Sequence, residues 1–363
     1  MSQMKSERDY NFLGELAMPT ISSNGKKYQL SGTLNPFQLE MQIHLVDWKR
    51  ENYPTIKPGM YRDHPNDAII LDDIASELPM IYTPIREELR QHIEKTHFRL
   101  HKHFNHVASS QAANINLFLP VVTHPKADTI LRSLKPDLAR IDRTRLDHGY
   151  RMEYWDGIDE FDGEKKSEGC LADHSNVSGT DADIAIAYIN HGGEPCLWLI
   201  EHKLTEAEFT ACGGFKSPGR KARHDCTKSF SQIIENTSLC YYHDVRKFNY
   251  WEITEENQSF FVNHNQFDQC PFQGGLNQLW RNQVLGFGIE NETGLPYKHV
   301  TFSVVKHPRN NYLDKSLKDY RKLIANNPKF TSFTSLDVVD ATVKIGNPEL
   351  DNWIAWYKDV YAI

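Results

Sequence analysis

The segment from residue 181 to residue 203 constrains the fold of this 363-residue chain more than any other part of the sequence. Residues 181–190 alternate between acidic or small side chains and Ile, Ile and Tyr, which is the period-two pattern of a β-strand. The turn-forming sequence Asn-His-Gly-Gly follows at 190–193. An apolar run then leads into Glu-His-Lys at 201–203. The sequence therefore predicts a β-hairpin whose second strand is buried.

The hairpin places two acidic residues opposite each other. If the turn is centred on Gly192, Asp183 and Glu201 are equally distant from it and face each other across the two strands. Directly opposed side chains have Cβ atoms about 4.5–5.5 Å apart, so two carboxylates can share one divalent cation. Lys203 lies on the same strand face as Glu201, whereas His202 points to the other face but can offer its backbone carbonyl.

Two carboxylates, a carbonyl and an ammonium group around one point can support metal-assisted hydrolysis of a phosphodiester. Mg²⁺ would polarise the scissile phosphate and bind water, and the lysine would orient that water or stabilise the developing charge. The alternative is a surface hairpin whose charged side chains form ion pairs of little energetic value. The residues alone leave both interpretations open.

The order of motifs resembles that of the PD-(D/E)XK nuclease superfamily, in its bacterial restriction-endonuclease-like branch. An acidic residue on one strand and Glu-x-Lys on the next are matched here by Asp183 and by Glu201, His202 and Lys203. The proline that names the motif is absent, and Asp181 is a second candidate for the acidic position. From Ser109 onward the resemblance also covers three further segments: Asn116–Pro120, Glu153-Tyr154 and Gln278–Arg281.

The resemblance implies an α/β fold with a restriction-endonuclease-like core, a central mixed sheet flanked by helices. We expect this nuclease domain over residues 107–363 and a mostly helical accessory region over 1–106. The implied function is Mg²⁺-dependent DNA endonuclease activity in restriction, defence or repair, with Mn²⁺ as an alternative cofactor. DNA is the expected partner, and double-strand cleavage with one site per chain would favour a homodimer. The alternative is a non-catalytic module of the same fold that binds nucleic acid or protein.

The resemblance also assigns roles to individual residues. The catalytic set would be Asp183, Glu201 and Lys203. The metal would contact Asp183 and Glu201, with the carbonyl of His202 and the carboxylate of Glu153 as further ligands. A glutamine on the helix that follows Glu-x-Lys reaches the active site or a strand in related nucleases, and Gln278 takes that position here.

The net charge of this chain differs from that of proteins that coat DNA. Lys and Arg number 41 and Asp and Glu 48, so the net charge is −7 and indiscriminate coating of nucleic acid is excluded. Residues 212–228 nevertheless concentrate basic side chains in a Gly- and Pro-containing loop, for which a solvated loop without a partner is the alternative. The predicted nucleic-acid contacts are Lys216, Arg220, Lys221, Arg223, Gln278 and Arg281.

Four cysteines follow the Glu-x-Lys strand, at Cys212, Cys226, Cys240 and Cys270. They could hold a structural zinc ion or an iron–sulfur cluster, but the lack of a Cys-x-x-Cys pair favours free thiols. His97 and His101 have the i, i+4 spacing of two metal ligands on a helix that would begin at 83–84 and extend to residue 107, although solvated or core-facing histidines are the alternative. Pro120 should end any helix or central strand.

No apolar run is long enough to span a membrane. The first nine residues also lack the apolar core of a secretory signal, so we expect a cytoplasmic protein.

Overall fold

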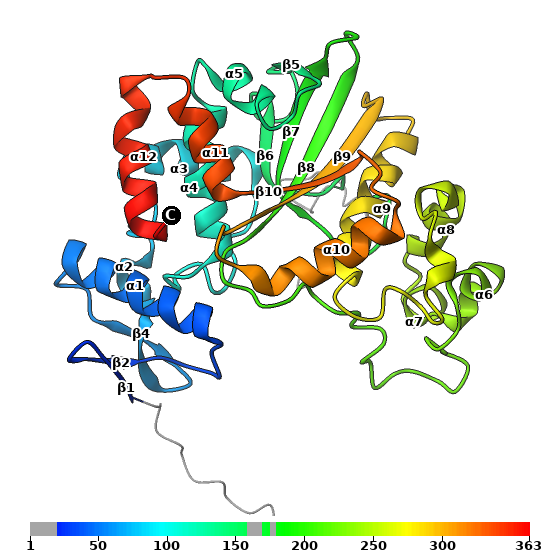
Figure 1. Cartoon of the computed structure of the whole chain (residues 1–363), viewed down its shortest axis with the longest axis horizontal. Coiled ribbons are helices and arrows are strands. Elements are labelled where there is room, and N and C mark those ends of the chain that lie inside the picture. Colours follow the sequence, from blue (N-terminus) through cyan, green and yellow to red (C-terminus); the bar gives the residue numbers. More distant parts are fainter. Residues whose placement is uncertain (1–19, 158–168, 175–178) are drawn as a thin grey trace, which may run out of the picture.

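The computed structural model describes residues 20–157, 169–174 and 179–363. The first nine residues, which bear on the expected cytoplasmic location, lie outside these ranges. An N-terminal region with small sheets lies beside a larger α/β body (Figure 1). Within the described ranges, no helix has the length and apolar character needed to cross a membrane.

A mixed sheet of six strands forms the centre of the α/β body. Strands β7 (Ala182–Asn190) and β8 (Pro195–Lys203) form the antiparallel hairpin that the sequence predicts. Beyond β8, strands β9 (His299–Lys306) and β10 (Phe330–Thr334) continue the sheet in parallel. On the other side, β5 (Leu138–Ile141) and β6 (Tyr150–Tyr154) both pair antiparallel with β7. The expected central mixed sheet is confirmed.

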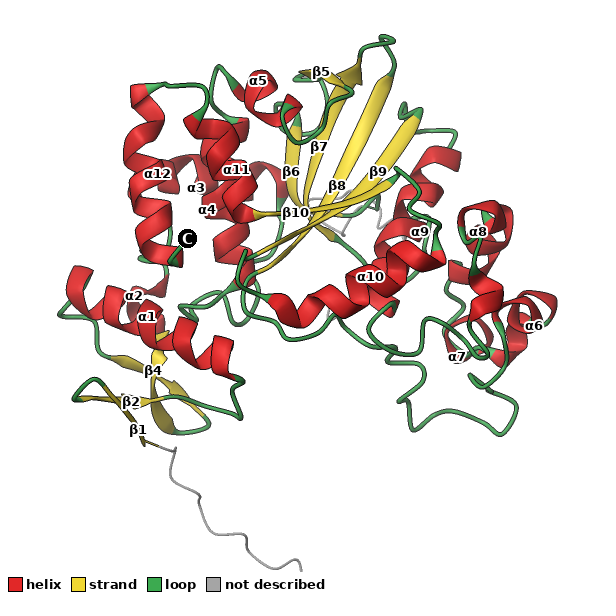
Figure 2. Cartoon of the chain, viewed as in Figure 1, coloured by secondary structure: helices red, strands yellow, loops and turns green. Residues whose placement is uncertain are grey.

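Helices cover both faces of this sheet (Figure 2). Ile184 and Ile186 of β7 share one hydrophobic core with helices α4 (Ser110–Val122), α11 (Ser335–Val343) and α12 (Pro348–Tyr361). Ala185 of β7 and Leu199 of β8 share a second core with α8 (Tyr250–Glu256), α9 (Asn277–Asn291) and α10 (Asp314–Leu323). Because side chains alternate along a strand, the odd-numbered residues at the end of β8 point to the α9 side.

Short helices complete the body. Helix α5 (Ala127–Arg132) precedes β5. Between β8 and α9 the chain forms a long insertion with the short helices α6 (Phe230–Glu235) and α7 (Tyr241–Asp244) before α8. This insertion lies at the right-hand side of Figure 1, where α8 packs against α9.

The N-terminal region was expected to be mostly helical, and this is wrong. It contains two antiparallel hairpins, β1 (Thr20–Ser23) with β2 (Lys26–Gln29) and β3 (Pro58–Tyr61) with β4 (His64–Ile70). Its helices are α1 (Pro36–Asn52), α2 (Asp72–Ala75) and α3 (Arg86–Thr96). The β3–β4 turn is formed by Arg62 and Asp63, which both adopt positive φ, as tight hairpin turns with right-handed twist require.

This region shares the hydrophobic core of the α4 side of the sheet. Met41 of α1 belongs to the same buried cluster as Trp353 of α12. The division of the chain at residue 106 therefore stays a prediction.

Two helix boundaries also differ from the expectation. The helix expected from residue 83 to residue 107 ends at Thr96, because His97 adopts φ 54° and closes it with a left-handed cap. Pro120 does not end α4 but lies inside it. A proline leaves the carbonyl four residues earlier without its helical donor. In α4 that carbonyl, on Asn116, accepts the indole N–H of Trp353 at 2.8 Å, so α12 satisfies the group that the proline leaves unpaired.

Candidate active site

The β7–β8 register brings the two predicted acidic residues together. Ile184 pairs with Ile200, so Asp183 and Glu201 occupy the next positions along the two strands. The Oδ2 atom of Asp183 accepts the backbone N–H of His202 at 2.6 Å, which fixes the aspartate against the end of β8. The predicted juxtaposition of Asp183 and Glu201 is therefore present in the fold.

Three donors hold the carboxylate of Glu201. The ammonium group of Lys203 lies 2.8 Å from Oε1. From α9, the Gln278 amide donates to Oε1 at 2.6 Å and the Asn282 amide donates to Oε2 at 2.8 Å. Glu201 and Lys203 are both buried. The glutamate is therefore fixed in one orientation by its own strand and by the helix that faces it.

Two further carboxylates approach this pair. Burial and the charges of Asp181 and Asp183 raise the pKa of Glu153 well above its usual range. Glu153 has φ 48°, a left-handed conformation that is costly for a residue with a side chain and is often found at functional sites. Burial and the charge of Glu201 likewise raise the pKa of Asp181 to about 6. Four acidic residues thus share one electrostatic environment.

The predicted catalytic pair and lysine show opposing electrostatic effects. Burial and the charge of Glu201 raise the pKa of Asp183, while Lys203 and the His202 N–H act in the opposite direction. Burial alone would lower the pKa of Lys203, but Glu201, Glu206 and Asp183 together raise it above its usual value. Lys203 is therefore a permanent cation among carboxylates, which suits a group that stabilises negative charge.

His202 faces away from the carboxylates, as its position in the strand predicts. The hydroxyl of Ser110, at the start of α4, donates to the backbone carbonyl of His202 at 2.7 Å. Burial lowers the pKa of the His202 imidazole to about 3, so this ring is neutral at physiological pH. The carbonyl expected to be a metal ligand thus already accepts one hydrogen bond and has one lone pair left for a cation.

The donor set can be compared with the needs of Mg²⁺. Among the described residues, no group of three or more His, Cys, Asp or Glu side chains is arranged to hold a metal ion. Mg²⁺, however, is usually bound by one or two carboxylates together with water and substrate phosphate. The three donors on Glu201 leave a lone pair on Oε2, and Asp183 accepts its one described hydrogen bond on Oδ2. Asp183 and Glu201 therefore fit a magnesium ion that completes its coordination with water and phosphate.

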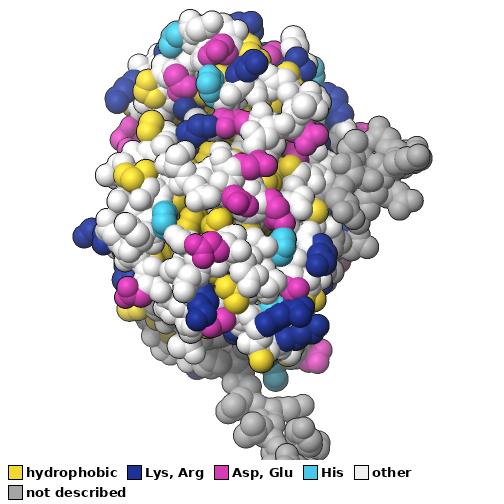
Figure 3. All heavy atoms as spheres, turned by 90° about the vertical axis from the view of Figure 1, so that its right-hand side faces the viewer, with side chains coloured by type: hydrophobic (Ala, Val, Ile, Leu, Met, Phe, Trp, Pro, Cys, Tyr) yellow, Lys and Arg dark blue, Asp and Glu magenta, His cyan; other side chains and the backbone are white. Residues whose placement is uncertain are grey.

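Besides Arg281, the predicted nucleic-acid contacts separate into three groups. Gln278 binds Glu201, as described above, and is a positioning residue rather than part of a surface. Arg223 donates to Asp244 at 2.9 Å, and Arg220 donates to the backbone carbonyl of Phe215 at 3.0 Å. Lys216 and Lys221 are exposed on the same loop. Figure 3 shows acidic and basic side chains interspersed on the face of the molecule that includes this side.

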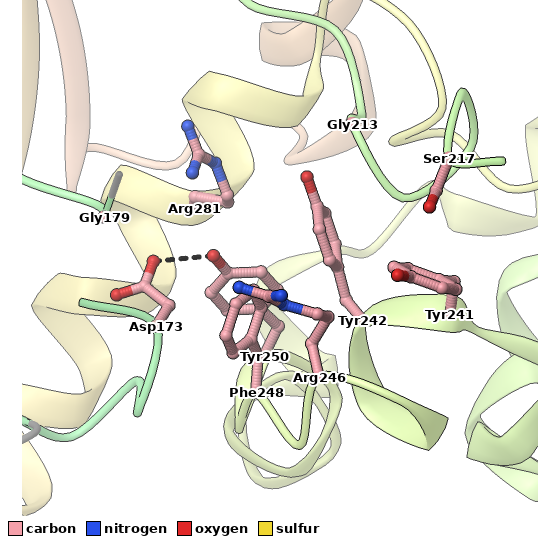
Figure 4. A pocket seen from close by; sticks show the side chains of 10 residues that line it. All are labelled: Asp173, Gly179, Gly213, Ser217, Tyr241, Tyr242, Arg246, Phe248, Tyr250 and Arg281. Carbon is pink, nitrogen blue, oxygen red and sulfur yellow. Dashed lines mark hydrogen bonds between the residues drawn. The ribbon is translucent and has the colours of Figure 1, made fainter. Parts of the chain in front are cut away.

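Arg281 lines a cavity of about 250 Å³ beside the acidic cluster. Arg246 also lines this cavity, 5.4 Å from the ring centroid of Phe248, and Tyr242 and Tyr250 line it as well (Figure 4). The charge of Arg281 opposes the rise in the pKa of Asp181, so the cavity adjoins the carboxylates electrostatically. The Nε atom of Arg281 is buried without a hydrogen-bond partner in the part of the chain that the structure describes.

The i, i+4 arrangement of His97 and His101 is not formed. His97 ends α3 in a left-handed conformation, so His101 does not follow it on the same helical face.

Sequence reasoning missed three residues that build the site. Asn282 lies four residues after Gln278, so both residues share one face of the helix. This spacing could have identified Asn282 from the sequence. Ser110 and Asn114 belong to α4, and the Asn114 amide donates to the backbone carbonyl of Asp183 at 2.9 Å. No local pattern indicates those two contacts, because α4 and the hairpin are far apart in the sequence.

Removing the Asn282 amide should loosen Glu201. We expect Asn282→Ala to lower any metal-dependent activity of the site about 10–100-fold, as is typical for groups that orient a metal ligand. It should also lower the free energy of unfolding by about 1–3 kcal/mol, because a buried acceptor loses its donor. Urea unfolding and activity titrated against Mg²⁺ measure the two effects. Asn291→Ala is the matched control, since Asn291 lies on the same helix but donates to the remote Glu256; equal effects from both variants would contradict this role.

The raised pKa of Asp181 predicts the pH dependence of stability without divalent cations. The folded-state pKa of about 6 exceeds the usual value of 3.8, so the protonated carboxyl is favoured by folding. In EDTA, the free energy of unfolding should therefore fall as the pH rises through this interval. Urea unfolding measured in steps across it should show a shallower decline for Asp181→Asn. Identical pH profiles for the variant and the original chain would be incompatible with this electrostatic environment.

Comparison with known proteins agrees with the geometry of the site. The family model described as "Restriction Endonuclease associating with ARP" matches residues 42–362. Neither the curated proteins nor the solved structures include a match to the chain. The family expected from the order of the motifs is confirmed: the chain belongs to this restriction endonuclease family.

Proposed function

We propose that this protein is a Mg²⁺-dependent DNA endonuclease of restriction or defence. The observation that carries the proposal is the buried arrangement of Asp183, Glu201 and Lys203 at the ends of two paired strands. A buried ion pair such as that of Lys203 and Glu201 adds little net stability, because the cost of removing both charges from water offsets their attraction. A reaction that needs a metal cation and a fixed positive charge explains why these charged residues are buried together. Membership of the restriction endonuclease family supports DNA as the substrate.

In the proposed reaction, Asp183 and Glu201 would hold the magnesium ion. Bound Mg²⁺ supplies polarisation of the scissile phosphate. Gln278 and Asn282 keep the Glu201 carboxylate in its orientation, and the His202 N–H does the same for Asp183. The Lys203 ammonium donates hydrogen bonds toward the attacking water or the charge that develops on the phosphate. Glu153 remains a candidate for an outer ligand.

The DNA would approach from the α9 side of the sheet. Arg281 and Arg246 offer positive charge near the carboxylates, and Lys216 and Lys221 extend it along the neighbouring loop. Phosphate contacts of this kind position a duplex without reading its sequence. Net charge −7 predicts that binding is weak, decreases with salt and increases with Mg²⁺. Association with ARP, which the family description names, is likewise a proposal for this chain.

A plasmid assay tests the proposed function. Supercoiled DNA is incubated with the protein in Mg²⁺, in Mn²⁺ and in EDTA. We expect open-circular or linear DNA with either metal and intact DNA in EDTA. Conversion of a closed circle demonstrates endonuclease action, because an exonuclease needs an end. A protein that binds DNA but leaves circular, linear, single-stranded and RNA substrates intact in both metals would instead be the non-catalytic module.

A further inference from the structure

Three of the four cysteines in the insertion between β8 and α9 are brought together by backbone hydrogen bonds. The N–H of Cys270 donates to the carbonyl of Cys226 at 3.2 Å, so these two residues are direct neighbours. Asp225 donates its N–H to the carbonyl of Leu239 at 3.0 Å. Asp225 immediately precedes Cys226, and Leu239 immediately precedes Cys240, so Cys226 also adjoins Cys240. Three chain segments therefore meet at this point.

The fourth cysteine joins from the other end of the insertion. Cys212 donates its N–H to the carbonyl of Gln273, close to Cys270, at 3.3 Å. The thiol of Cys270 interacts electrostatically with the other three, and Cys212 and Cys226 each interact with Cys240. None of the four forms a disulfide. We call these four residues the cysteine quartet.

Backbone donors surround the sulfur atoms of the quartet. Cys212 accepts hydrogen bonds at sulfur from the N–H groups of Gly214 and Phe215, the latter at 3.3 Å. The sulfur of Cys240 accepts hydrogen bonds from the N–H groups of Tyr242 and His243, and the sulfur of Cys270 accepts one from the N–H group of Phe272. Hydrogen bonds from N–H groups favour a charged sulfur over a neutral thiol. Three separate turns therefore present donors suited to thiolates.

The charges of the thiolates need a cation. Cys212 and Cys270 are buried, so an uncompensated thiolate at either position would be costly. A thiophilic metal would replace the thiol protons, and its positive charge would balance the thiolates that the N–H groups of the turns stabilise.

Two kinds of metal centre take four thiolate ligands. A single zinc ion requires four sulfurs at about 2.3 Å from one point. Among the described residues no such preformed single-ion site exists. In a four-iron cluster each thiolate binds a different iron, so the sulfurs stand farther apart. We propose that Cys212, Cys226, Cys240 and Cys270 bind an iron–sulfur cluster.

The position of the quartet indicates a structural role for the cluster. Cys270 lies shortly before α9, the helix that positions Glu201 through Gln278 and Asn282. The cluster would cross-link four segments of an insertion whose secondary structure consists of short helices. Binding releases the thiol protons to solvent and involves no change in the oxidation state of sulfur. The inference does not depend on nuclease activity.

Metal analysis of protein purified without oxygen tests the inference. We expect about four iron and about four acid-labile sulfide per chain. A broad visible absorption that bleaches with dithionite should accompany them. If the cluster is lost in purification, ferric iron and sulfide added anaerobically with excess dithiothreitol, which reduces half of the iron, should restore it. Cys226→Ser and Cys240→Ser should each lower the iron content severalfold, whereas Cys170→Ser, outside the quartet, should retain it.

Several outcomes would overturn the inference. If metal analysis finds one zinc per chain and no iron, the quartet binds a single zinc ion and not a cluster. No iron after reconstitution, with all four thiols free to alkylating reagent, would show that the quartet binds no metal. Disulfides within the quartet, found by mass spectrometry of unreduced protein, would give the cysteines a covalent role instead. The iron content of the unmodified chain decides among these cases even if a variant fails to fold.

Discussion

Asp183→Asn should abolish detectable DNA cleavage while stabilising the protein in the absence of metal. The variant keeps the acceptor for the His202 N–H, which the aspartate binds at 2.6 Å, but removes a charge that burial and Glu201 both disfavour. Loss of a metal ligand should lower the cleavage rate at least about 10²-fold. Removal of like-charge repulsion should raise the free energy of unfolding by roughly 1 kcal/mol in EDTA.

The opposite signs of these two effects distinguish a functional carboxylate from a structural one. A plasmid cleavage time course measures the first effect, and urea unfolding in EDTA measures the second. Asp181→Asn is the matched comparison, because Asp181 is the second candidate for the acidic position. We expect it to retain more activity than Asp183→Asn. If Asp183→Asn cleaves normally and Asp181→Asn is inactive, the two assignments are exchanged.

Local patterns predicted the part of the site that lies within one hairpin. The register of β7 and β8 follows from the position of Gly192, because strands joined by a short turn can pair in few ways. The alternation of side chains then places Glu201 and Lys203 on one face and His202 on the other. Both features required only residues close together in the sequence.

Contacts between distant segments could not be predicted in this way. Pro120 remains in α4 because Trp353, far along the chain, binds the carbonyl that the proline leaves unpaired. The cysteine quartet lacks the Cys-x-x-Cys spacing, since each of its members comes from a different segment. In each case tertiary contacts outweigh the local signal.

Replacing Lys203 should show that this cation and magnesium stabilise the same carboxylates. The ammonium group lies 2.8 Å from Glu201 in a buried site. Lys203→Met leaves Glu201 without its cation, so the free energy of unfolding in EDTA should fall by about 3–5 kcal/mol. Cleavage should fall about 10²–10³-fold, because a preorganised donor to the transition state is lost.

Magnesium should recover part of that stability and little of the activity. The ion can supply positive charge to Glu201 and Asp183, so the Mg²⁺-induced increase in stability should be larger for Lys203→Met than for the unmodified chain. Lys306→Met is the matched control, because Lys306 pairs with Lys203 in the register of β9 but binds Asp314 at 3.0 Å. Urea unfolding with and without Mg²⁺, together with plasmid cleavage, measures these effects. Normal cleavage by Lys203→Met, or an equal loss in Lys306→Met, would remove Lys203 from the proposed mechanism.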